Sequence, residues 1–547
     1  MSEPPSAANI FGNPILRRYW RSRLRPVWLG TTIVMALVIA GFIATISYLP
    51  LRYRGNFTEA DAARAAFLPL LIVQAIIVMF AGTGGVGAGI LQEVEEGMIE
   101  YQRLTPLSPL AKVLGYLFGL PARQYVSFAV TAIFSALSIL VGKIPFTAWG
   151  SVYLVFFTSA ILYHLLALIT GLIIKSRWRA GVISLGLVVL LNFVLPRLAN
   201  FGFIIFSHLT ILPVIMANFL DLTPHWRGML SAVPEAISSP SVLFFGLNVS
   251  HLAFSLVVQG SLILTFIVIL VRRWRDEQAH LLGKGYAVGF LIWIQVILLG
   301  NVLPLLERGS VISGVLKRRG FFMPDVFSVS GRYEARALGI IYGVISLLLL
   351  LPVISCITPA EDTQMIAFRR RKKFGQSRIP FFADGATAAP FVWLAAGLSG
   401  VAWAMVVQRL LTLPAFEGTG FPPSAWAVFT GVILVVGALF HFLVETAGRR
   451  AAWVIVFLAG FVPLFTSLVL VSINNRYFDT AEYIVALSAL SAPWQPIQWI
   501  DQLAKGDAGS FGPLALFLGV HLGLCLILVI LWRRRRRGLE DRMTKDE

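Results

Sequence analysis

Residues 511–537 read FGPLALFLGVHLGLCLILVILWRRRRR, an apolar run that ends in five consecutive arginines. No Asp, Glu, Lys or Arg occurs between Phe511 and Trp532. A bilayer core of about 30 Å is crossed by about 20 apolar residues in a helix, and basic residues collect at the cytoplasmic ends of such helices. The stretch therefore predicts a membrane-spanning helix whose carboxyl end lies in the cytoplasm.

The composition of the whole chain supports the same interpretation. Of the 547 residues, 57% are hydrophobic and only 13% are charged, and the mean hydropathy is +0.80. A soluble domain carries about 25% charged residues, so the composition excludes a soluble enzyme and a disordered or fibrous protein. The two cysteines, Cys356 and Cys525, are too few for a disulfide framework.

The same length criterion predicts twelve membrane spans. They are 27–49, 66–91, 122–141, 151–174, 180–196, 249–271, 286–303, 335–357, 390–413, 425–446, 451–473 and 511–532. Two further apolar stretches, 200–220 and 484–500, are interrupted by prolines and are interpreted as re-entrant or interfacial segments on the outer side. The predicted fold class is all-α: a polytopic membrane protein with about 12 transmembrane helices in two six-helix halves.

The distribution of basic residues sets the predicted orientation. With the N-terminus in the cytoplasm, 30 of the 45 Lys and Arg residues lie inside and 15 outside, as the positive-inside rule requires. Because the net charge of +18 is placed at the ends of apolar runs, it indicates membrane lipid and no nucleic acid as its partner. We therefore expect a multi-pass protein of a bacterial cytoplasmic membrane with both termini in the cytoplasm.

The N-terminal residues are not interpreted as a cleavable signal, because the following apolar run is longer than a signal peptide allows. Residues 13–25 instead predict an interfacial helix that Asn13 caps and Pro14 begins. Leu16, Tyr19, Trp20 and Leu24 are expected to share its apolar face. Arg17, Arg18, Arg21 and Arg25 are expected to reach lipid phosphate.

Two parts of the chain match at an offset of 277 residues. Ala148-Trp149 recurs as Ala425-Trp426, and Leu162-Tyr163-His164 recurs as Leu439-Phe440-His441. This ordered set predicts a duplication, and an even number of spans gives both halves one orientation around a central path. The predicted regions are an interfacial helix (1–26), two six-span halves (27–280 and 281–532) and a charged cytoplasmic tail (533–547).

An acidic cluster follows the second predicted span. Glu93, Glu95, Glu96 and Glu100 lie in a segment predicted to face the cytoplasm. Cytoplasmic loops are usually basic, so the cluster indicates a protein partner, although a solvated helical turn with incidental acids is an equal alternative. At 3.6 residues per turn, Glu93, Glu96 and Glu100 are expected to share one helical face.

The residues after this cluster predict a helix boundary. Thr105-Pro106 is expected to end the acidic helix, and Ser108-Pro109 is expected to cap and begin the next one.

This segment resembles the coupling region of ABC-2 type transporter permeases. That family carries an acidic stretch with a glycine, an apolar helical turn, Thr-Pro-Leu-Ser, and then a Lys and a Gly that enter the third span. The N-terminal helix resembles the family's elbow helix, and six spans with a broken segment before the sixth resemble its architecture. The clear resemblance covers residues 10–280, and the matching positions are Glu93, Glu96, Gly97, Thr105, Pro106, Leu107, Ser108, Lys112 and Gly115.

The resemblance implies the membrane-spanning subunit of an ATP-driven transporter, and most directly an exporter. It also implies a separate nucleotide-binding ATPase subunit in two copies, which would bind ATP and Mg and push segment 92–112. The residues implied in coupling are Glu93, Glu95, Glu96, Gly97, Glu100, Thr105, Pro106 and Ser108.

The second half departs from this pattern in segment 358–389. Thr358-Pro359 persists, but the acidic stretch with glycine is missing, and a basic run from Arg369 to Lys373 follows. One interpretation is a second, unlike ATPase contact. The alternative is a surface that binds lipid headgroups. The residues concerned are Thr358, Pro359, Arg369, Arg370 and Arg371.

The sequence also lacks several kinds of site. No Gly-x-x-x-x-Gly-Lys-Ser/Thr motif occurs, so the chain has no phosphate-binding loop for ATP. Glu445 is the only carboxylate within the predicted spans, which argues against an ion-driven carrier. His164 and His441 could line the path, but hydrogen-bonded packing between helices is the favoured alternative.

We therefore expect no catalytic residue, no metal and no cofactor in this chain. The rival hypotheses are an ATP-independent channel or secondary carrier and, with less support, a multi-span membrane enzyme.

Overall fold

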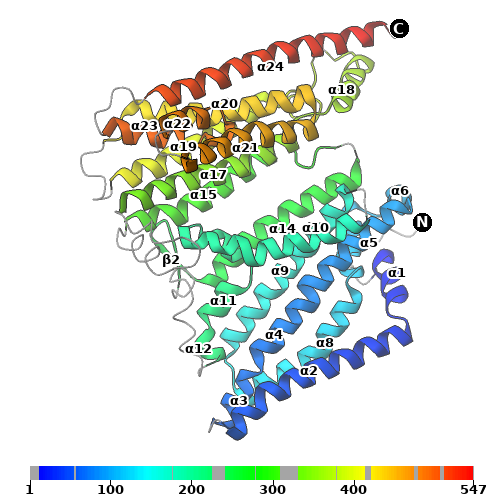
Figure 1. The fold of residues 1–547 in the computed structure, drawn as a ribbon. Coiled ribbons are helices and arrows are strands. Elements are labelled where there is room, and N and C mark those ends of the chain that lie inside the picture. The colour runs from blue at the N-terminus through cyan, green and yellow to red at the C-terminus, as the bar shows by residue number, and fades with distance from the viewer. Residues whose placement is uncertain are drawn as a thin grey trace. The chain divides into compact units, whose positions relative to one another are not determined.

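A computed structural model of the chain describes residues 12–54, 57–174, 177–223, 241–277, 279–307, 331–376, 378–412, 420–473, 478–504 and 511–545. These residues are almost entirely helical (Figure 1). The only strands among them, β1 (Val242–Phe244) and β2 (Leu247–Val249), form a small antiparallel hairpin. The predicted all-α class is confirmed.

Twelve helices of the described residues are long and apolar enough to cross a membrane, which confirms the predicted multi-pass membrane protein. Each predicted span coincides with one of them, and the boundaries differ by at most seven residues. The span helices are α2 (Pro26–Arg54), the succession α3 (Glu59–Ala65), α4 (Phe67–Ala75), η1 (Ile76–Gly82) and α5 (Thr83–Glu95), then α8 (Ala122–Gly142), α9 (Phe146–Ile173), α10 (Arg177–Val189) with η2 (Leu190–Val194), α14 (His251–Arg275), α15 (Lys284–Glu307), α17 (Gly331–Ile357), α19 (Ala389–Leu411), α20 (Pro423–Ala447), α21 (Arg449–Ile473) and α24 (Gly512–Lys545).

Shorter helices connect the spans. They are α1 (Pro14–Arg23), α6 (Met98–Leu104), α7 (Pro109–Gly119), η3 (Leu195–Phe201), η4 (Ile204–Leu209), α11 (Leu212–Ala217), α12 (Phe219–Leu222), α18 (Glu361–Lys373), α22 (Phe478–Ala486), η9 (Ala489–Ser491) and α23 (Gln495–Ala504).

The chain divides into two compact units, residues 1–277 and 278–547. The division lies close to residue 280, where the sequence predicts the boundary between the halves. Lys317, Arg318 and Arg319, which the predicted orientation counts among the 15 basic residues on the outer side, lie outside the described residues.

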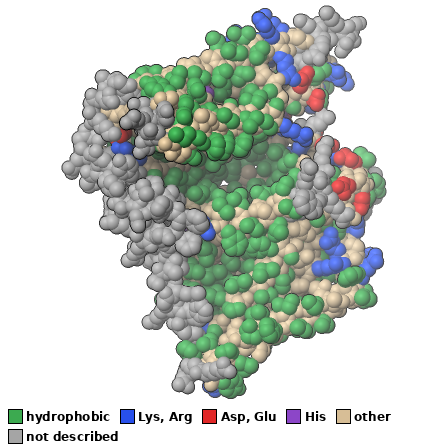
Figure 2. Space-filling view, in the orientation of Figure 1, with side chains coloured by type: hydrophobic (Ala, Val, Ile, Leu, Met, Phe, Trp, Pro, Cys, Tyr) green, Lys and Arg blue, Asp and Glu red, His purple; other side chains and the backbone are tan. Residues whose placement is uncertain are grey.

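Helix α9 is the centre of the first unit. It packs against α5, α14 and α10, and its buried side chains from Ala148 to Tyr163 form much of the unit's hydrophobic core. Helix α2 lies on the outside and leaves most of its apolar side chains exposed, as expected of a helix that faces lipid. Figure 2 shows hydrophobic side chains over the spans and charged side chains at the end where α1 and α6 lie.

Helix α20 has the corresponding place in the second unit. It begins at Pro423, 277 residues after α9 begins at Phe146, and it packs against α19, α24, α21 and α17. Helices α19 and α20 approach closely at Gly400, where a Cβ atom would lie 2.6 Å from the Cα of Thr430 and 3.3 Å from the carbonyl oxygen of Phe429. Both of these atoms belong to the backbone, so only a glycine fits without moving one helix.

Gly400→Ala is therefore expected to lower the free energy of unfolding by about 1–3 kcal/mol, since the added methyl group overpacks the helix interface. Gly431→Ala on α20 is the matched control, because no atom lies within 4 Å of its would-be Cβ. Denaturant unfolding of both variants in detergent measures the difference. Equal stability of the two would contradict this account of the interface.

The two proline-containing apolar stretches are broken into short helices in both units. In the first, η3, η4, α11 and α12 precede α14, and two of their carbonyl groups accept from side chains of the spans. The Tyr163 hydroxyl donates to the oxygen of Leu209 at 2.9 Å, and the Gln259 amide donates to the oxygen of His208 at 2.9 Å. In the second, the Ser488 hydroxyl of the broken stretch donates to the oxygen of Gly460 in α21 at 2.7 Å and so ties the stretch to that helix. Non-helical backbone at membrane depth requires such protein partners.

Candidate functional site

The N-terminal helix α1 docks on α7 through an asparagine and two glycines. The Asn13 side chain accepts from the amide of Ile15 at 3.0 Å, which confirms the predicted cap, and donates to the oxygen of Ala111 at 2.6 Å. Ile15 and Tyr19 pack against Gly115 and Gly119, where a Cβ atom would lie 2.8 Å and 3.0 Å from them. The contact fixes α1 against the segment that leads into the third span.

The predicted apolar face of α1 is partly wrong. Leu16 and Tyr19 are buried, but Ile15 is buried as well and Trp20 is 41% exposed. The docking on α7 rotates the helix so that the Trp20 indole lies at the edge, where it donates to the oxygen of Phe118 at 3.3 Å. The predicted basic side chains Arg17, Arg18, Arg21 and Arg25 are exposed.

Glu93 lies beneath α1 and is buried. Its carboxylate accepts from the guanidinium of Arg18 and from the hydroxyl of Tyr116 at 3.3 Å. Tyr116 also stacks on Trp274 of α14, with ring centroids 5.4 Å apart. Burial, and then the neighbouring Glu93, raises the pKa of the Tyr19 and Tyr116 hydroxyls, so both remain neutral. Glu93 therefore joins α1, α5 and α7 and is not available to a partner.

The prediction that Glu93, Glu96 and Glu100 share one helical face is wrong. Helix α5 ends at Glu95, and Gly97 adopts a left-handed conformation (φ 69°) before α6 begins at Met98. Glycine enters this region without the steric penalty of a side chain. The turn leaves Glu95, Glu96 and Glu100 exposed while Glu93 points inward.

Arg103 fixes α6 to the end of the sixth span. Its guanidinium donates to Glu100 at 2.6 Å and 2.8 Å, to Glu277 at 2.8 Å and to the oxygen of Arg273 at 3.4 Å. The sequence offered no signal for this contact, because Arg103 and Glu277 are far apart in the chain.

The predicted boundary between the two helices of this segment is confirmed. Helix α6 ends at Leu104, directly before Thr105, and the Ser108 hydroxyl accepts from the amide of Ala111 at 3.2 Å to cap α7. Lys112 is buried and donates to the oxygens of Arg103 at 3.4 Å and Thr105 at 3.2 Å. Burial lowers the pKa of Lys112, and the two carbonyl groups fix the connection between α6 and α7.

Two exposed apolar side chains lie among the acids of this segment. Tyr101 is 63% exposed and Leu104 is 86% exposed, both on α6. Together with Glu95, Glu96 and Glu100 they form a surface, which we call the α6 surface. The sequence pattern did not single out Tyr101 and Leu104, because an apolar residue in a short helix is normally assigned to the core.

Removal of the Arg18 side chain tests how much the ion pair with Arg18 stabilises the buried carboxylate of Glu93. Arg18→Ala is expected to lower the free energy of unfolding by about 1–2 kcal/mol, because Glu93 loses its cation; the usual cost of breaking a buried pair is reduced by the 40% exposure of Arg18. Glu93→Gln should cost less than about 1 kcal/mol, since Arg18 then returns to water. Thermal unfolding of both variants and of the double variant measures this. A larger cost for Glu93→Gln than for Arg18→Ala would contradict the expected asymmetry.

The corresponding segment of the second unit is built differently. Helix α18 is tied to α24 by an ion pair between Glu361 and Arg535, and Phe368 is buried with the guanidinium carbons of Arg371 at 5.1 Å and Arg536 at 5.9 Å from its ring centroid. Arg369 and Arg370 of the basic run are exposed. The Pro359 oxygen accepts from Gln364 at 3.4 Å.

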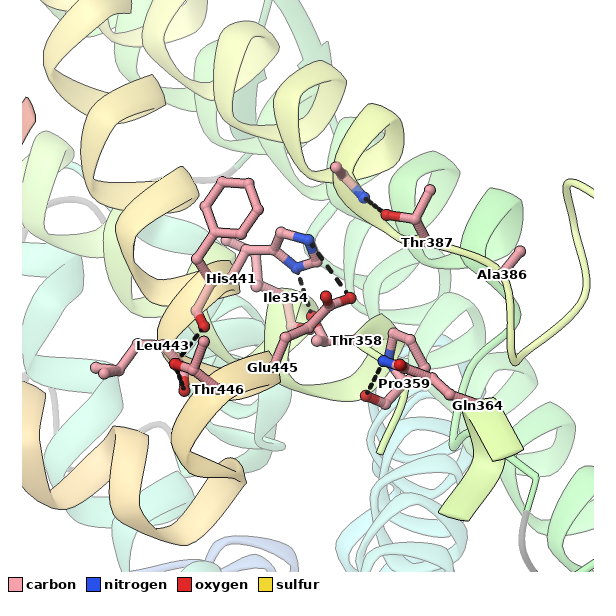
Figure 3. Close-up of polar contacts among 12 residues, drawn as sticks. Ile354, Thr358, Pro359, Gln364, Ala386, Thr387, His441, Leu443, Glu445 and Thr446 are labelled. Atoms are coloured by element: carbon pink, nitrogen blue, oxygen red, sulfur yellow. Dashed lines mark hydrogen bonds and ion pairs between the residues drawn. The ribbon is translucent and has the colours of Figure 1, made fainter. Parts of the chain in front are cut away.

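The two histidines of the repeat are fully buried and contact neighbouring helices. His164 has its Nε2 atom 3.0 Å from the oxygen of Val78 and its Nδ1 atom 3.3 Å from the hydroxyl of Tyr125. His441 has its Nδ1 atom 3.0 Å from the hydroxyl of Thr358 and its Nε2 atom 3.8 Å from Glu445 (Figure 3). The sequence contains a signal for the last pair, a carboxylate four residues after the histidine in a helix.

No group of three or more His, Cys, Asp or Glu side chains that could hold a metal ion occurs among the described residues. Comparison with family models, with curated proteins and with solved structures finds no match.

Proposed function

We propose that this chain is the membrane-spanning subunit of an ABC-2 type, ATP-driven transporter, that it works as an exporter, and that a separate ATPase dimer powers it. In this proposal both termini and segment 92–112 face the cytoplasm of a bacterial cell. The proposal rests on the sequence resemblance of residues 10–280, and one structural observation supports it most: the α6 surface is exposed and firmly anchored.

The α6 surface has the composition of a site for a folded protein. Exposed Tyr101 and Leu104 supply apolar area, and Glu95, Glu96 and Glu100 supply a negative rim. Interfaces between proteins combine an apolar centre with a charged rim. The charge implies a basic patch on the partner. This favours the protein-partner interpretation over incidental acids, because incidental acids do not explain the exposed Leu104.

The contacts that anchor the α6 surface suggest how a movement of the ATPase would be transmitted to the membrane spans. Helix α6 follows the second span directly, α7 leads into the third, and Arg103 joins α6 to the end of the sixth. In the proposed mechanism, closure of the ATPase dimer on ATP moves α6, and these three spans move with it. The residues of this chain bind and transmit, and the bond that breaks belongs to ATP on the partner.

Purification of the full chain from its native membrane tests the proposal. We expect a nucleotide-binding subunit to co-purify, and we expect vesicles that contain both proteins to hydrolyse ATP and move a cargo. Transport driven by an ion gradient without ATP would replace the proposal by a secondary carrier. Turnover of a lipid or peptide by the chain alone would replace it by a membrane enzyme.

A further inference from the structure

We propose that His441 and Glu445 of α20 form a proton-binding site that holds one proton, either on the imidazole or on the carboxyl group. The site lies at the end of α20 where the second unit's α17 passes into α18. It goes beyond the proposed function and does not depend on it, because it concerns groups inside this chain only.

The two contacts of the Thr358 hydroxyl determine the tautomer of His441. The Thr358 hydroxyl lies 2.7 Å from the oxygen of Ile354 and 3.0 Å from the Nδ1 atom of His441. A carbonyl oxygen can only accept, so the single hydroxyl proton belongs to the bond with Ile354. The hydroxyl oxygen is then an acceptor toward His441, and Nδ1 must carry a hydrogen.

This tautomer leaves two acceptors facing each other. With the hydrogen on Nδ1, the Nε2 atom of a neutral His441 carries a lone pair and can only accept. This atom lies 3.8 Å from the Oε1 atom of Glu445. The histidine side chain is fully buried and that of Glu445 is 2% exposed. An ionised Glu445 would place negative charge against a lone pair in a buried site. One proton, on either group, converts the contact into an attraction.

The groups around Glu445 do not satisfy its carboxyl oxygens. Within the described part of the chain, neither oxygen has a hydrogen-bond partner. Lys284 of α15 and Arg536 of α24 are cations that face it, and the Trp532 indole N–H is a donor beside the carboxyl group that lies outside hydrogen-bond distance. Arg535 of α24 donates to the backbone oxygens of Glu445 at 3.4 Å and of Thr446, and its guanidinium is paired with Glu361. The Lys284 ammonium group donates to the backbone oxygens of Ala383 at 2.7 Å and Ala386 at 2.6 Å.

The remaining cations are also engaged elsewhere. Arg536 lies over the rings of Phe368 and Trp532, and Arg449 of α21 donates to the oxygen of Thr358 at 2.9 Å. Helix α19 carries one charged residue, Arg409, at its opposite end. A buried carboxylate without a hydrogen bond is strongly disfavoured, and one proton on the pair either neutralises that charge or gives it a cationic partner.

The first unit provides a natural comparison. At the offset of 277 residues, His164 corresponds to His441, but Leu168 stands where Glu445 would be. The Nε2 atom of His164 must donate to the oxygen of Val78, so its Nδ1 atom accepts from the hydroxyl of Tyr125. His164 is therefore a satisfied neutral histidine of the opposite tautomer. Of the two equivalent positions, only that of the second unit carries an acid, Glu445, and it lies near the junction between α17 and α18.

The bound proton holds a junction together. Thr358 is the last residue before Pro359 and α18, and it is bound by His441 through its hydroxyl and by Arg449 through its carbonyl group. When the proton leaves, repulsion between Glu445 and His441 opposes the arrangement that places the imidazole on Thr358. Proton loss would therefore loosen the connection between α17 and α18.

Two spectroscopic measurements on the full chain in lipid nanodiscs test the site near neutral pH. Infrared difference spectra between wild type and Glu445→Gln report a protonated carboxyl group, and ¹⁵N histidine NMR reports an imidazolium. We expect either a carboxylic acid band that Glu445→Gln removes, or an imidazolium signal of His441 that Glu445→Gln converts to a neutral one. Alkaline pH should abolish the same signal in the wild type.

Absence of both signals, with an ionised Glu445 beside a neutral His441, would overturn the proposal. The amide of Glu445→Gln can donate to Nε2 of His441 and so preserves the contact, which allows the variant to fold. His164 is the internal control: its nitrogen signals should show the Nε2–H tautomer and should not respond to Glu445→Gln. A response of His164 equal to that of His441 would attribute the change to general disruption and would also count against the site.

Discussion

Leu104→Asp is expected to weaken binding of the ATPase subunit by at least about 30-fold. Leu104 is the most exposed apolar side chain of the α6 surface, at 86%. An apolar residue that becomes the centre of an interface contributes roughly 2 kcal/mol or more, which corresponds to about 30-fold in Kd. The introduced carboxylate also adds repulsion within an acidic surface. Titration of the purified ATPase onto the chain in nanodiscs measures the effect.

Glu96→Arg should weaken the same binding and should reduce its salt dependence, because Glu96 belongs to the charged rim. Glu59→Arg is the matched control, since Glu59 is an exposed acid that begins the same span at its opposite end. Both Leu104 and Glu96 are exposed, so neither substitution should change folding by more than about 0.5 kcal/mol. Full affinity in Leu104→Asp would show that the partner binds elsewhere.

Local sequence patterns predict some of these features and not others. The twelve spans could be predicted because a bilayer demands an apolar run of fixed length, which is a local property of the chain. The Asn13 and Ser108 caps could be predicted for the same reason, because each satisfies an amide within three residues. Glu93 could not be assigned correctly, since its burial depends on Arg18, which is 75 residues away.

Other features depend on tertiary contacts that carry no local pattern. Arg103 meets Glu277 across 174 residues, and the exposure of Leu104 follows from the turn at Gly97. The pair of His441 and Glu445 could be predicted only in part. Its spacing of four residues is visible in the sequence, but the hydroxyl of Thr358 that fixes the tautomer comes from another helix. Charge and spacing in the sequence therefore identify candidate functional residues, and tertiary packing determines which of them are exposed.

Gly115→Leu is expected to release α1 from α7. The Cβ atom of any side chain at position 115 would lie 2.8 Å from the Cβ of Ile15 and 3.0 Å from the Oδ1 atom of Asn13. Overpacking of this kind costs about 1–3 kcal/mol, and loss of the hydrogen bond from Asn13 to Ala111 adds about 1 kcal/mol. A total of roughly 3 kcal/mol raises the undocked fraction of α1 about 100-fold.

Trypsin cleavage after Arg17 or Arg18 in nanodiscs measures this release, because a protease cuts a helix only when it opens locally. Gly30→Leu on α2 is the matched control, since nothing lies within 4 Å of its would-be Cβ. Unchanged protection in Gly115→Leu would mean that α1 is held by the membrane surface and not by α7. A released α1 also takes Arg18 from Glu93 and leaves the carboxylate buried alone. In the proposed transporter, Gly115→Leu should therefore preserve the α6 surface and ATPase binding but lower the cargo moved per ATP.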